Sequence, residues 1–311
     1  MCKAVFFFCT NPGRDHVAPA LFDAVRQIYA PEEMDMIFDG KSVHRHTDSL
    51  GNDFLFVPTD EVVSHDYSRY APLIDESFSD CDFAGICNWH EGLNAPDNIL
   101  IVQTTGDMED GIFGDVDPRH IRNLLLAIEQ GRALACLDDF TTYLEGTHWS
   151  GKLYGGKSSQ IGDIRVPMID LEIGSSPSAW RNQQAVSVMA KALCHVFDHR
   201  DEDARSVLCV GGVHMEPTWA NAVLGSTEGR ALALSHVLPN HWLVSHGYDT
   251  EVGYQKLLAC ASSIIGGVDA IAFHEKLNAD YKNQVRRLGE ALGVPVYKHK
   301  RLRDLNSLEL W

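Results

Sequence analysis

Two hydrophobic periodicities alternate along the chain. Short continuous apolar runs predict buried strands at residues 3–9, 54–57, 83–88, 98–104, 166–173, 206–211, 231–237, 268–273 and 294–298. Apolar residues spaced three and four apart predict helices at residues 17–29, 118–131, 178–197, 217–224, 251–264 and 279–292. Strands that alternate with helices are typical of a three-layer α/β/α domain, and we predict that fold class.

Two segments lack either periodicity. Residues 30–75 are rich in Asp, Ser, His and Pro, and residues 145–165 contain five glycines, so we interpret both as long irregular excursions. Loops of this length inside a compact domain are usually functional. The 311 residues, 45% of them hydrophobic, are enough for one catalytic α/β domain over residues 1–311, with a weakly marked subdomain boundary near residue 140.

Composition excludes several classes of protein. No apolar run approaches the roughly 20 residues of a membrane span, and residues 1–9 have the pattern of a core strand rather than of a signal peptide. The eight cysteines form no C-x-x-C pair, which argues against a disulfide framework or a cysteine-rich zinc knuckle. We therefore expect a cytoplasmic protein without a membrane partner.

The net charge of −17, taken alone, argues against a nucleic-acid partner, because phosphate binding needs a basic surface. Basic residues are nevertheless grouped in two places. Residues 298–303 form a basic cluster near the C-terminus, and Lys152 and Lys157 flank the glycine-rich excursion. Each group is equally compatible with an ordinary solvated face.

Residues 207–218 carry the clearest chemical signal. An apolar strand leads into Gly211 and Gly212 and then presents His214. Glycines allow positive φ angles and close approach of a ligand, and ligands of α/β proteins gather beyond the carboxyl ends of strands. A local turn with a hydrogen-bonded histidine is the alternative. The pattern recurs where apolar runs lead to His90, His148 and His236, and if one sheet holds these strands, the histidines converge on one rim.

Imidazole and carboxylate groups suit zinc, which in catalytic sites takes three protein ligands and leaves one position open. Glu172 lies in an apolar run, where an unpaired acid is costly to bury. The alternative is strand alternation, with Asp170 and Glu172 both on a solvated face. The chain has no H-E-x-x-H motif, no G-x-S-x-G motif and no complete phosphate-binding loop, so spacing alone identifies no site.

Several short blocks, in this order, resemble the D-aminoacyl-tRNA deacylases of the archaeal and plant type. The blocks are Asn-Trp-His-Glu at 88–91, Gln-Thr-Thr-Gly-Asp at 103–107, Gly-Thr-His at 146–148, Glu-Ile-Gly-Ser at 172–175, Gly-Gly-Val-His at 211–214, Ser-His at 235–236 and Phe-His-Glu-Lys at 273–276. They cover about residues 80–300. Gln103 and Trp149 stand where that family commonly has histidine, which leaves the completeness of a metal set open.

The resemblance implies a phosphorylase/hydrolase-like α/β/α fold with a mixed sheet and a proofreading hydrolase. The reaction is zinc-dependent hydrolysis of the ester that joins a D-amino acid to tRNA. The implied zinc ligands are His90, His148, His214 and His236. The implied catalytic groups are Glu172 as ligand or general base, His214, Thr147, and the backbone N–H groups of Gly211 and Gly212, which stabilise an oxyanion.

Two other functions stay open. A metallohydrolase of a small ester or amide, acting without tRNA, explains the acidity better and the order of the blocks worse. A non-catalytic binding protein that kept the fold and lost part of the metal site is the second alternative. Metal content distinguishes the binding protein from both hydrolases. A basic groove beside the histidines distinguishes a tRNA substrate from a small one.

Overall fold

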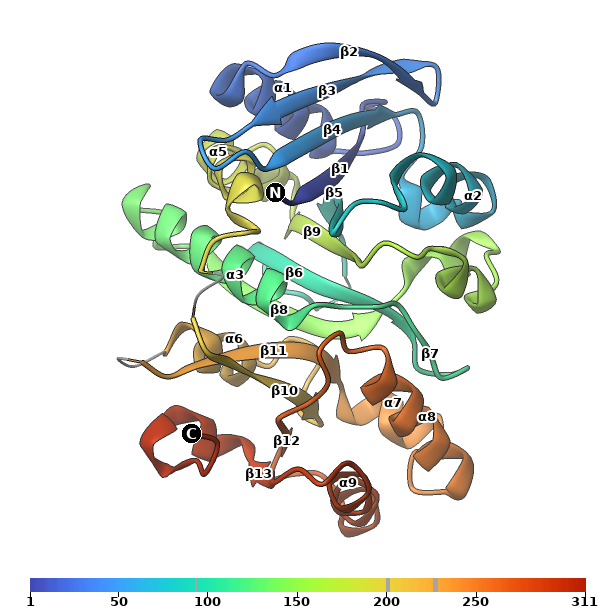
Figure 1. Cartoon of the computed structure of the whole chain (residues 1–311), viewed down its shortest axis with the longest axis vertical. Helices are drawn as coiled ribbons and strands as arrows, with labels where there is room; N and C mark the ends of the chain where they lie inside the picture. Colours follow the sequence, from blue (N-terminus) through green and yellow to red (C-terminus); the bar gives the residue numbers. More distant parts are fainter. Residues whose placement is uncertain (93, 200–201, 226–228) are drawn as a thin grey trace.

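The computed structural model describes residues 1–92, 94–199, 202–225 and 229–311. Its strands form two sheets (Figure 1). The larger contains β1 (Lys3–Cys9), β2 (Glu32–Phe38), β3 (Lys41–Thr47), β4 (Asp53–Thr59), β5 (Phe83–His90), β6 (Asn98–Asp107), β7 (Ile112–Phe113), β8 (Thr141–His148) and β9 (Met168–Ser175). The smaller contains β10 (Ala204–Val210), β11 (Ala231–Leu238), β12 (Ala270–Phe273) and β13 (Val296–Lys298).

The larger sheet is mixed and the smaller one is parallel. The order of the larger sheet is β2-β3-β4-β1-β5-β9-β6-β7, and β8 pairs with β6. Strands β4, β1, β5 and β9 are parallel, whereas β6 and β8 run in the opposite direction to β9. The order of the smaller sheet is β11-β10-β12-β13. The predicted α/β/α class with a mixed sheet is confirmed.

Helices pack on both sheets. They are α1 (Ala18–Tyr29), α2 (Tyr67–Phe78), α3 (Pro118–Leu134), α4 (Pro177–Trp180), α5 (Gln183–Ala192), α6 (Pro217–Leu224), α7 (Asn240–Ser245), α8 (Glu251–Ser262) and α9 (Ala279–Leu292). Helices α1 and α2 cover opposite faces of the larger sheet, and α9 packs on the smaller one. The 3-10 turns are η1 (Val63–His65), η2 (Ser150–Tyr154), η3 (Ser158–Asp163), η4 (Leu193–His195), η5 (His299–Arg303) and η6 (Leu305–Ser307).

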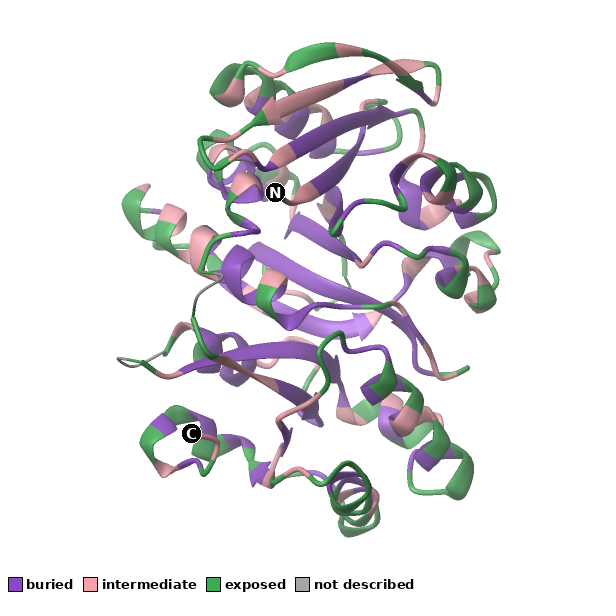
Figure 2. Cartoon of the chain, viewed as in Figure 1, coloured by how far each residue is buried: buried purple, intermediate pink, exposed green. Residues whose placement is uncertain are grey.

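Strand β1 shows how the layers form. Its side chains alternate between the faces of the sheet, and Phe8 packs on Phe22 of α1 while Phe7 packs on Phe78 of α2. All of its phenylalanines are buried, because both faces of this central strand are covered (Figure 2). The continuous apolar run at residues 3–9 therefore marks a strand with a helix layer on each side.

The two sheets meet where β8 lies beside β11. Hydrogen bonds connect them: for example, the Val237 N–H donates to Thr147 Oγ1 at 3.0 Å, and the Gly146 N–H donates to the carbonyl of His214 at 2.8 Å. Helix α3 contacts strands of both sheets. We call the junction of β8 with β11 and the loop after β10 the seam.

Three predictions need correction. Residues 30–75 are not irregular, because they contain β2, β3, β4, η1 and part of α2; β2 is a solvent-exposed edge strand rich in acids, and Pro72 lies inside α2. Residues 141–148 are a strand, and the excursion that follows consists of η2 and η3. The helix predicted at 178–197 is divided into α4, α5 and η4.

The predicted single rim is wrong as well. Strands β10 and β11 belong to the smaller sheet, and β8 runs opposite to β5, so the carboxyl ends that carry His90 and His148 lie at opposite edges. The side chains of His90, His148 and His214 instead approach one another over one face of the larger sheet and across the seam.

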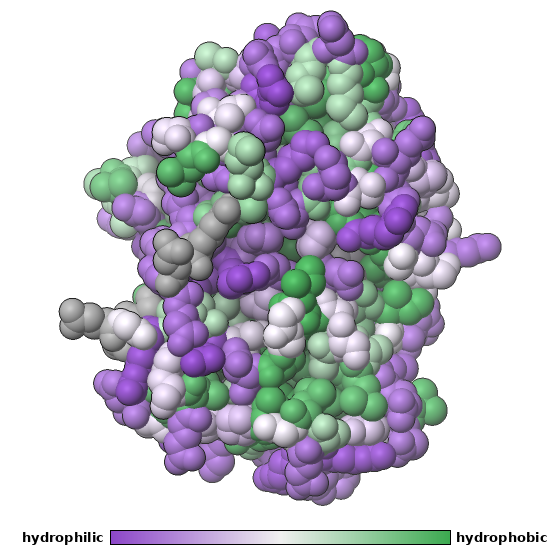
Figure 3. Space-filling model, viewed as in Figure 1, coloured by the Kyte–Doolittle hydropathy of each residue, from purple (hydrophilic) through white to green (hydrophobic). Residues whose placement is uncertain are grey.

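The surface fits the charge of the chain. In the view of Figure 3, hydrophilic residues make up most of the margin, and hydrophobic residues gather in patches over the region of the smaller sheet. Among the described residues, no helix has both the length and the apolar character to cross a membrane.

Candidate active site

A row of polar side chains lies on one face of the larger sheet. Register places Asn88 beside Glu172, and Gln103 between Asp170 and Glu145. All five are buried. A buried polar group is costly unless it is hydrogen-bonded or paired, so central strands normally place apolar residues at such positions. The row is therefore a candidate site rather than a feature of the core.

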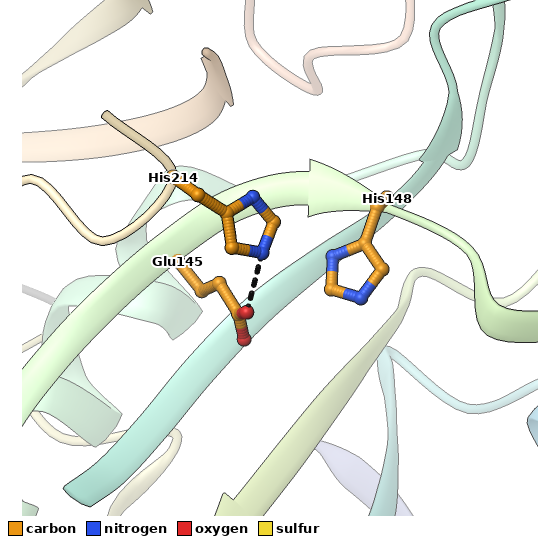
Figure 4. Close-up of side chains that lie close together, drawn as sticks. All are labelled: Glu145, His148 and His214. Carbon is orange, nitrogen blue, oxygen red and sulfur yellow. Dashed lines mark hydrogen bonds and ion pairs between the residues drawn. The ribbon is translucent and has the colours of Figure 1, made fainter. Parts of the chain in front are cut away.

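Glu145 is the centre of this site. Its Oε1 accepts from His214 Nε2 at 2.6 Å and from His90 Nε2 at 3.2 Å (Figure 4 draws the first contact). Burial would raise the pKa of Glu145, but the hydrogen bonds from His214 and His90 outweigh it and hold the pKa well below its usual range. Glu145 is thus an ionised carboxylate, fully buried between imidazoles.

His148 lies across from the hydrogen-bonded pair of Glu145 and His214 (Figure 4). The centroids of the His148 and His214 rings are 5.1 Å apart. The His148 Nδ1–H donates to the carbonyl of Gly146 at 3.0 Å, which leaves the lone pair on Nε2. Burial is the main cause that lowers its pKa. A neutral imidazole fixed by a backbone carbonyl is the usual form of a metal-binding histidine.

Two more carboxyl groups lie in the same row. Burial raises the pKa of Glu172 well above its usual value, and the charges of Glu145 and Asp170 raise it further. Burial, as the largest cause, likewise raises the pKa of Asp170 to about 7. Three acids on one buried face repel one another when ionised, so the site favours either protons or a cation among them.

The described residues include two groups whose side chains fit a metal ion. Glu145, His148 and His214 form one, and His90, Glu145 and Glu172 form the other, with ligand atoms within 4.8 Å of one another in each group. Glu145 Oε2 and His214 Nδ1 are buried and lack a hydrogen-bond partner among these residues. Imidazole nitrogens with carboxylate oxygens are a donor set that zinc accepts.

A cavity of about 470 Å³ opens above this cluster. One wall is the end of β5 with the residues that follow His90, and the other is formed by Val213, His214, Met215 and Trp242. The Trp242 ring lies 4.9 Å from the His214 ring, edge to face. The volume is in the range of small-molecule sites, and its floor is the imidazole–carboxylate cluster.

The structure brings His90, His148 and His214 together, with Glu172 beside them, but it does not bring His236 to the cluster. His236 is fully buried in the seam region, where Nδ1 lies 3.0 Å from Thr104 Oγ1 and Nε2 lies 3.0 Å from Ser263 Oγ. Burial lowers its pKa to about 3. Thr147 is also fully buried there, with its hydroxyl 2.6 Å from that of Thr104.

Gly211 and Gly212 shape the turn that presents His214. Both have φ near +90°, a conformation that glycine adopts without strain. The Gly211 N–H donates to the carbonyl of Leu238 at 2.7 Å, so it is not available to an oxyanion. The side chain of His214 remains 30% exposed and opens into the cavity.

Sequence reasoning missed Glu145. Its signal was an acid between Leu144 and Gly146, just before the Thr-His pair that was singled out. The glycine-rich sequence of residues 145–165 predicts a loop, where an acidic residue is common. Glu145 lies instead in a buried strand, where an acidic residue is costly unless it is paired.

The model of the D-aminoacyl-tRNA deacylase family matches residues 77–297. The chain belongs to this family. The match contains every residue of the two candidate metal groups, and the resemblance inferred from the sequence blocks is confirmed.

Two relatives agree with this family membership, and one solved structure shares the fold. The chain is 25% identical to the D-aminoacyl-tRNA deacylase of Pyrococcus abyssi, over 84% of this chain and 86% of the relative. It is 24% identical to that of Archaeoglobus fulgidus, over 86% and 89%. The crystal structure of AF0625, a conserved protein of unknown function, has the same fold: the TM-score is 0.75 with 19% identity, covering 97% of this chain and 96% of the other.

Proposed function

We propose that this member of the D-aminoacyl-tRNA deacylase family hydrolyses the ester bond between a D-amino acid and tRNA, with zinc at the cluster. The observation that carries the proposal is the convergence of Glu145, His148 and His214 on the floor of an open cavity.

The zinc ion would be held by Glu145, His148 and His214. Glu145 also belongs to the second candidate group, with His90 and Glu172. When bound, zinc polarises an ester carbonyl and acidifies water. This donor set suits the ion because His148 is neutral and Glu145 is ionised.

Hydrolysis also needs proton transfer. The attacking water loses a proton while the bond between the carbonyl carbon and the ribose oxygen breaks, and the ribose oxygen gains a proton. His90 lines the cavity and contacts Glu145, with Ser175 Oγ 2.5 Å from its Nδ1. We assign the transfer to His90, with Glu172 behind it as a ligand or general base.

The charge of −17 limits how tRNA binds. Lys152 does not offer free positive charge, because its Nζ lies 3.0 Å from Asp107 and 2.5 Å from Glu109. The basic residues of 298–303 begin at the last residue of β13, which is parallel to β10, so they share an edge with the loop after β10 that carries His214. Lys300 among them is paired with Glu275, with its Nζ 2.5 Å from a carboxylate oxygen. Two strand spacings, about 10 Å, separate β13 from β10. We propose these residues as phosphate contacts.

The test compares D-tyrosyl-tRNA with a free D-tyrosine ester, together with metal analysis of active protein. We expect a much higher kcat/KM for the tRNA substrate, stereochemical preference for the D-isomer, and zinc in the active protein. Equal kcat/KM values for both substrates would support the small-ester hydrolase, which the net charge and the paired Lys152 favour. Activity in protein free of transition metal would remove zinc from the mechanism.

A further inference from the structure

Five aromatic rings form a continuous row beside the cavity, and the proposed chemistry uses none of them. In spatial order they are Trp180, His16, Trp89, His65 and Tyr154. Adjacent ring centroids lie 4.8, 5.5, 5.6 and 3.7 Å apart. The rings come from α4, the loop after β1, the end of β5, η1 and η2. We call these five residues the aromatic row.

The aromatic row follows the edge where ligands of α/β proteins bind. The segments that carry His16, His65, Trp89 and Trp180 follow or end the parallel strands β1, β4, β5 and β9. Their carboxyl ends share one edge of the sheet. Tyr154 reaches this edge from η2 by stacking on His65 at an interplanar angle of 17°.

The aromatic row meets the candidate active site at the carboxyl end of β5. Trp89 precedes His90 in this strand and points to the opposite face of the sheet. The Trp180 Nε1–H, at one end of the row, donates to the carbonyl of His90 at 3.0 Å. A ligand that lies along the row therefore has one end at the backbone of His90, where β5 borders the cavity.

The rings are only partly covered by the protein. Tyr154 is 57% exposed, His16 is exposed, and Trp89, His65 and Trp180 are half-buried. The end rings each have one face against a histidine, since Trp180 stacks on His16 and Tyr154 stacks on His65. An aromatic ring with a supported face and solvent access is the arrangement on which unpaired nucleobases stack.

We infer that the aromatic row binds the unpaired 3′-terminal nucleotides of the RNA substrate by base stacking and so directs the terminal ester toward His90. This inference rests on the proposed function for the identity of the RNA. Base–aromatic stacking contributes about 1–3 kcal/mol per base in addition to contacts with the phosphates. Arg181, exposed and next to Trp180, supplies positive charge at one end of the row.

The test measures anisotropy of a short, dye-labelled single-stranded RNA that ends in CCA. Tyr154→Ala and His16→Ala should each weaken binding roughly 5- to 160-fold, which corresponds to the loss of one base–aromatic stack. Tyr154→Phe keeps the ring and should bind like wild type. The matched control is Leu153→Ala, which removes a neighbouring side chain that is 87% exposed and not aromatic.

A second measurement separates this inference from the proposed function. With D-tyrosyl-tRNA, Tyr154→Ala should raise KM and leave kcat near wild type, and cleavage of the free D-tyrosine ester should not change. If Tyr154→Ala and His16→Ala bind RNA more weakly but the wild-type protein has no deacylase activity, the proposed function is overturned and the aromatic row is retained as an RNA site. Equal RNA binding by wild type, Tyr154→Ala and His16→Ala would overturn the inference, as would concentration-dependent dimerisation that Tyr154→Ala abolishes.

Discussion

At the residue scale, Glu145 matters most, because it contacts both His90 and His214 and belongs to both candidate metal groups. Glu145→Gln keeps the shape of the side chain and removes its charge. We expect zinc content to fall and D-aminoacyl-tRNA hydrolysis to drop on the order of a hundredfold, as for other altered metal sites. Glu109→Gln, on the exposed partner of Lys152, is the control. Full zinc occupancy in the Glu145→Gln protein would show that the cluster is not the metal site.

His214 and His236 should differ in what they contribute. His214→Ala removes a candidate metal ligand whose side chain is 30% exposed, so we expect zinc content to fall and hydrolysis to fall on the order of a hundredfold. Loss of its hydrogen bond to the buried Glu145 carboxylate should also lower the free energy of unfolding. His236→Ala removes two buried hydrogen bonds, to the hydroxyls of Thr104 and Ser263, and should lower the free energy of unfolding by about 1–3 kcal/mol. Zinc content and denaturant unfolding of both variants test this, and normal stability of His236→Ala would contradict it.

His236 also predicts a pH dependence of stability. Its pKa is about 3 in the folded protein against 6.5 for a free imidazole, so between these values only the unfolded chain binds the proton. The free energy of unfolding should therefore fall as pH decreases below 6.5, by about 1.4 kcal/mol per pH unit for this histidine.

The raised pKa values of Asp170 and Glu172 act in the opposite sense, so a variant has to isolate the effect. Denaturant unfolding of wild type and His236→Gln between pH 7.5 and pH 5 provides the comparison. The variant should lose less stability on acidification than wild type does, and parallel curves would exclude His236 as the cause.

At the scale of elements, the seam positions His214 against β8. A Cβ on Gly146 would lie 2.3 Å from Pro239 and 2.9 Å from His214 Nδ1. Gly146→Ala should thus force the loop after β10 away from β8, lower the free energy of unfolding by about 1–3 kcal/mol, and weaken metal binding. Gly162→Ala, in η3, meets nothing within 4 Å and serves as the control. Unchanged zinc affinity in Gly146→Ala would mean that the seam does not set the position of His214.

At the scale of the whole molecule, the proposed tRNA substrate requires local positive charge on a chain whose net charge is −17. If the basic residues of 298–303 contact phosphates, Lys298→Ala and Arg303→Ala should weaken tRNA binding and flatten its salt dependence by about 0.7–0.9 units of log–log slope per lost contact. Lys191→Ala, on α5 and exposed, is the control. Salt titration of tRNA affinity checks this, and identical slopes for all three variants would place the phosphate contacts elsewhere.

The order of strands and helices was predictable because it depends on local pattern. Central strands such as β1 and β12 are apolar on both faces, and helices α6 and α9 begin and end where predicted. The same local reasoning failed for β2, whose exposed face carries acids, and for β8, whose buried face carries Glu145. A strand that contains polar residues is hard to predict from the sequence, because elements distant in the chain determine which of its faces are buried.

The sequence by itself determined the fold class, the family blocks and the histidine turn after β10, because each follows from neighbouring residues. Only the tertiary structure decided which of those residues meet. Glu145 contacts His90 across 55 residues and His214 across 69, through a reversal of strand direction and a seam between two sheets. Spacing in the sequence does not encode strand direction or side-chain approach, so His236 resembled a ligand in the sequence and is buried apart from the cluster in the fold.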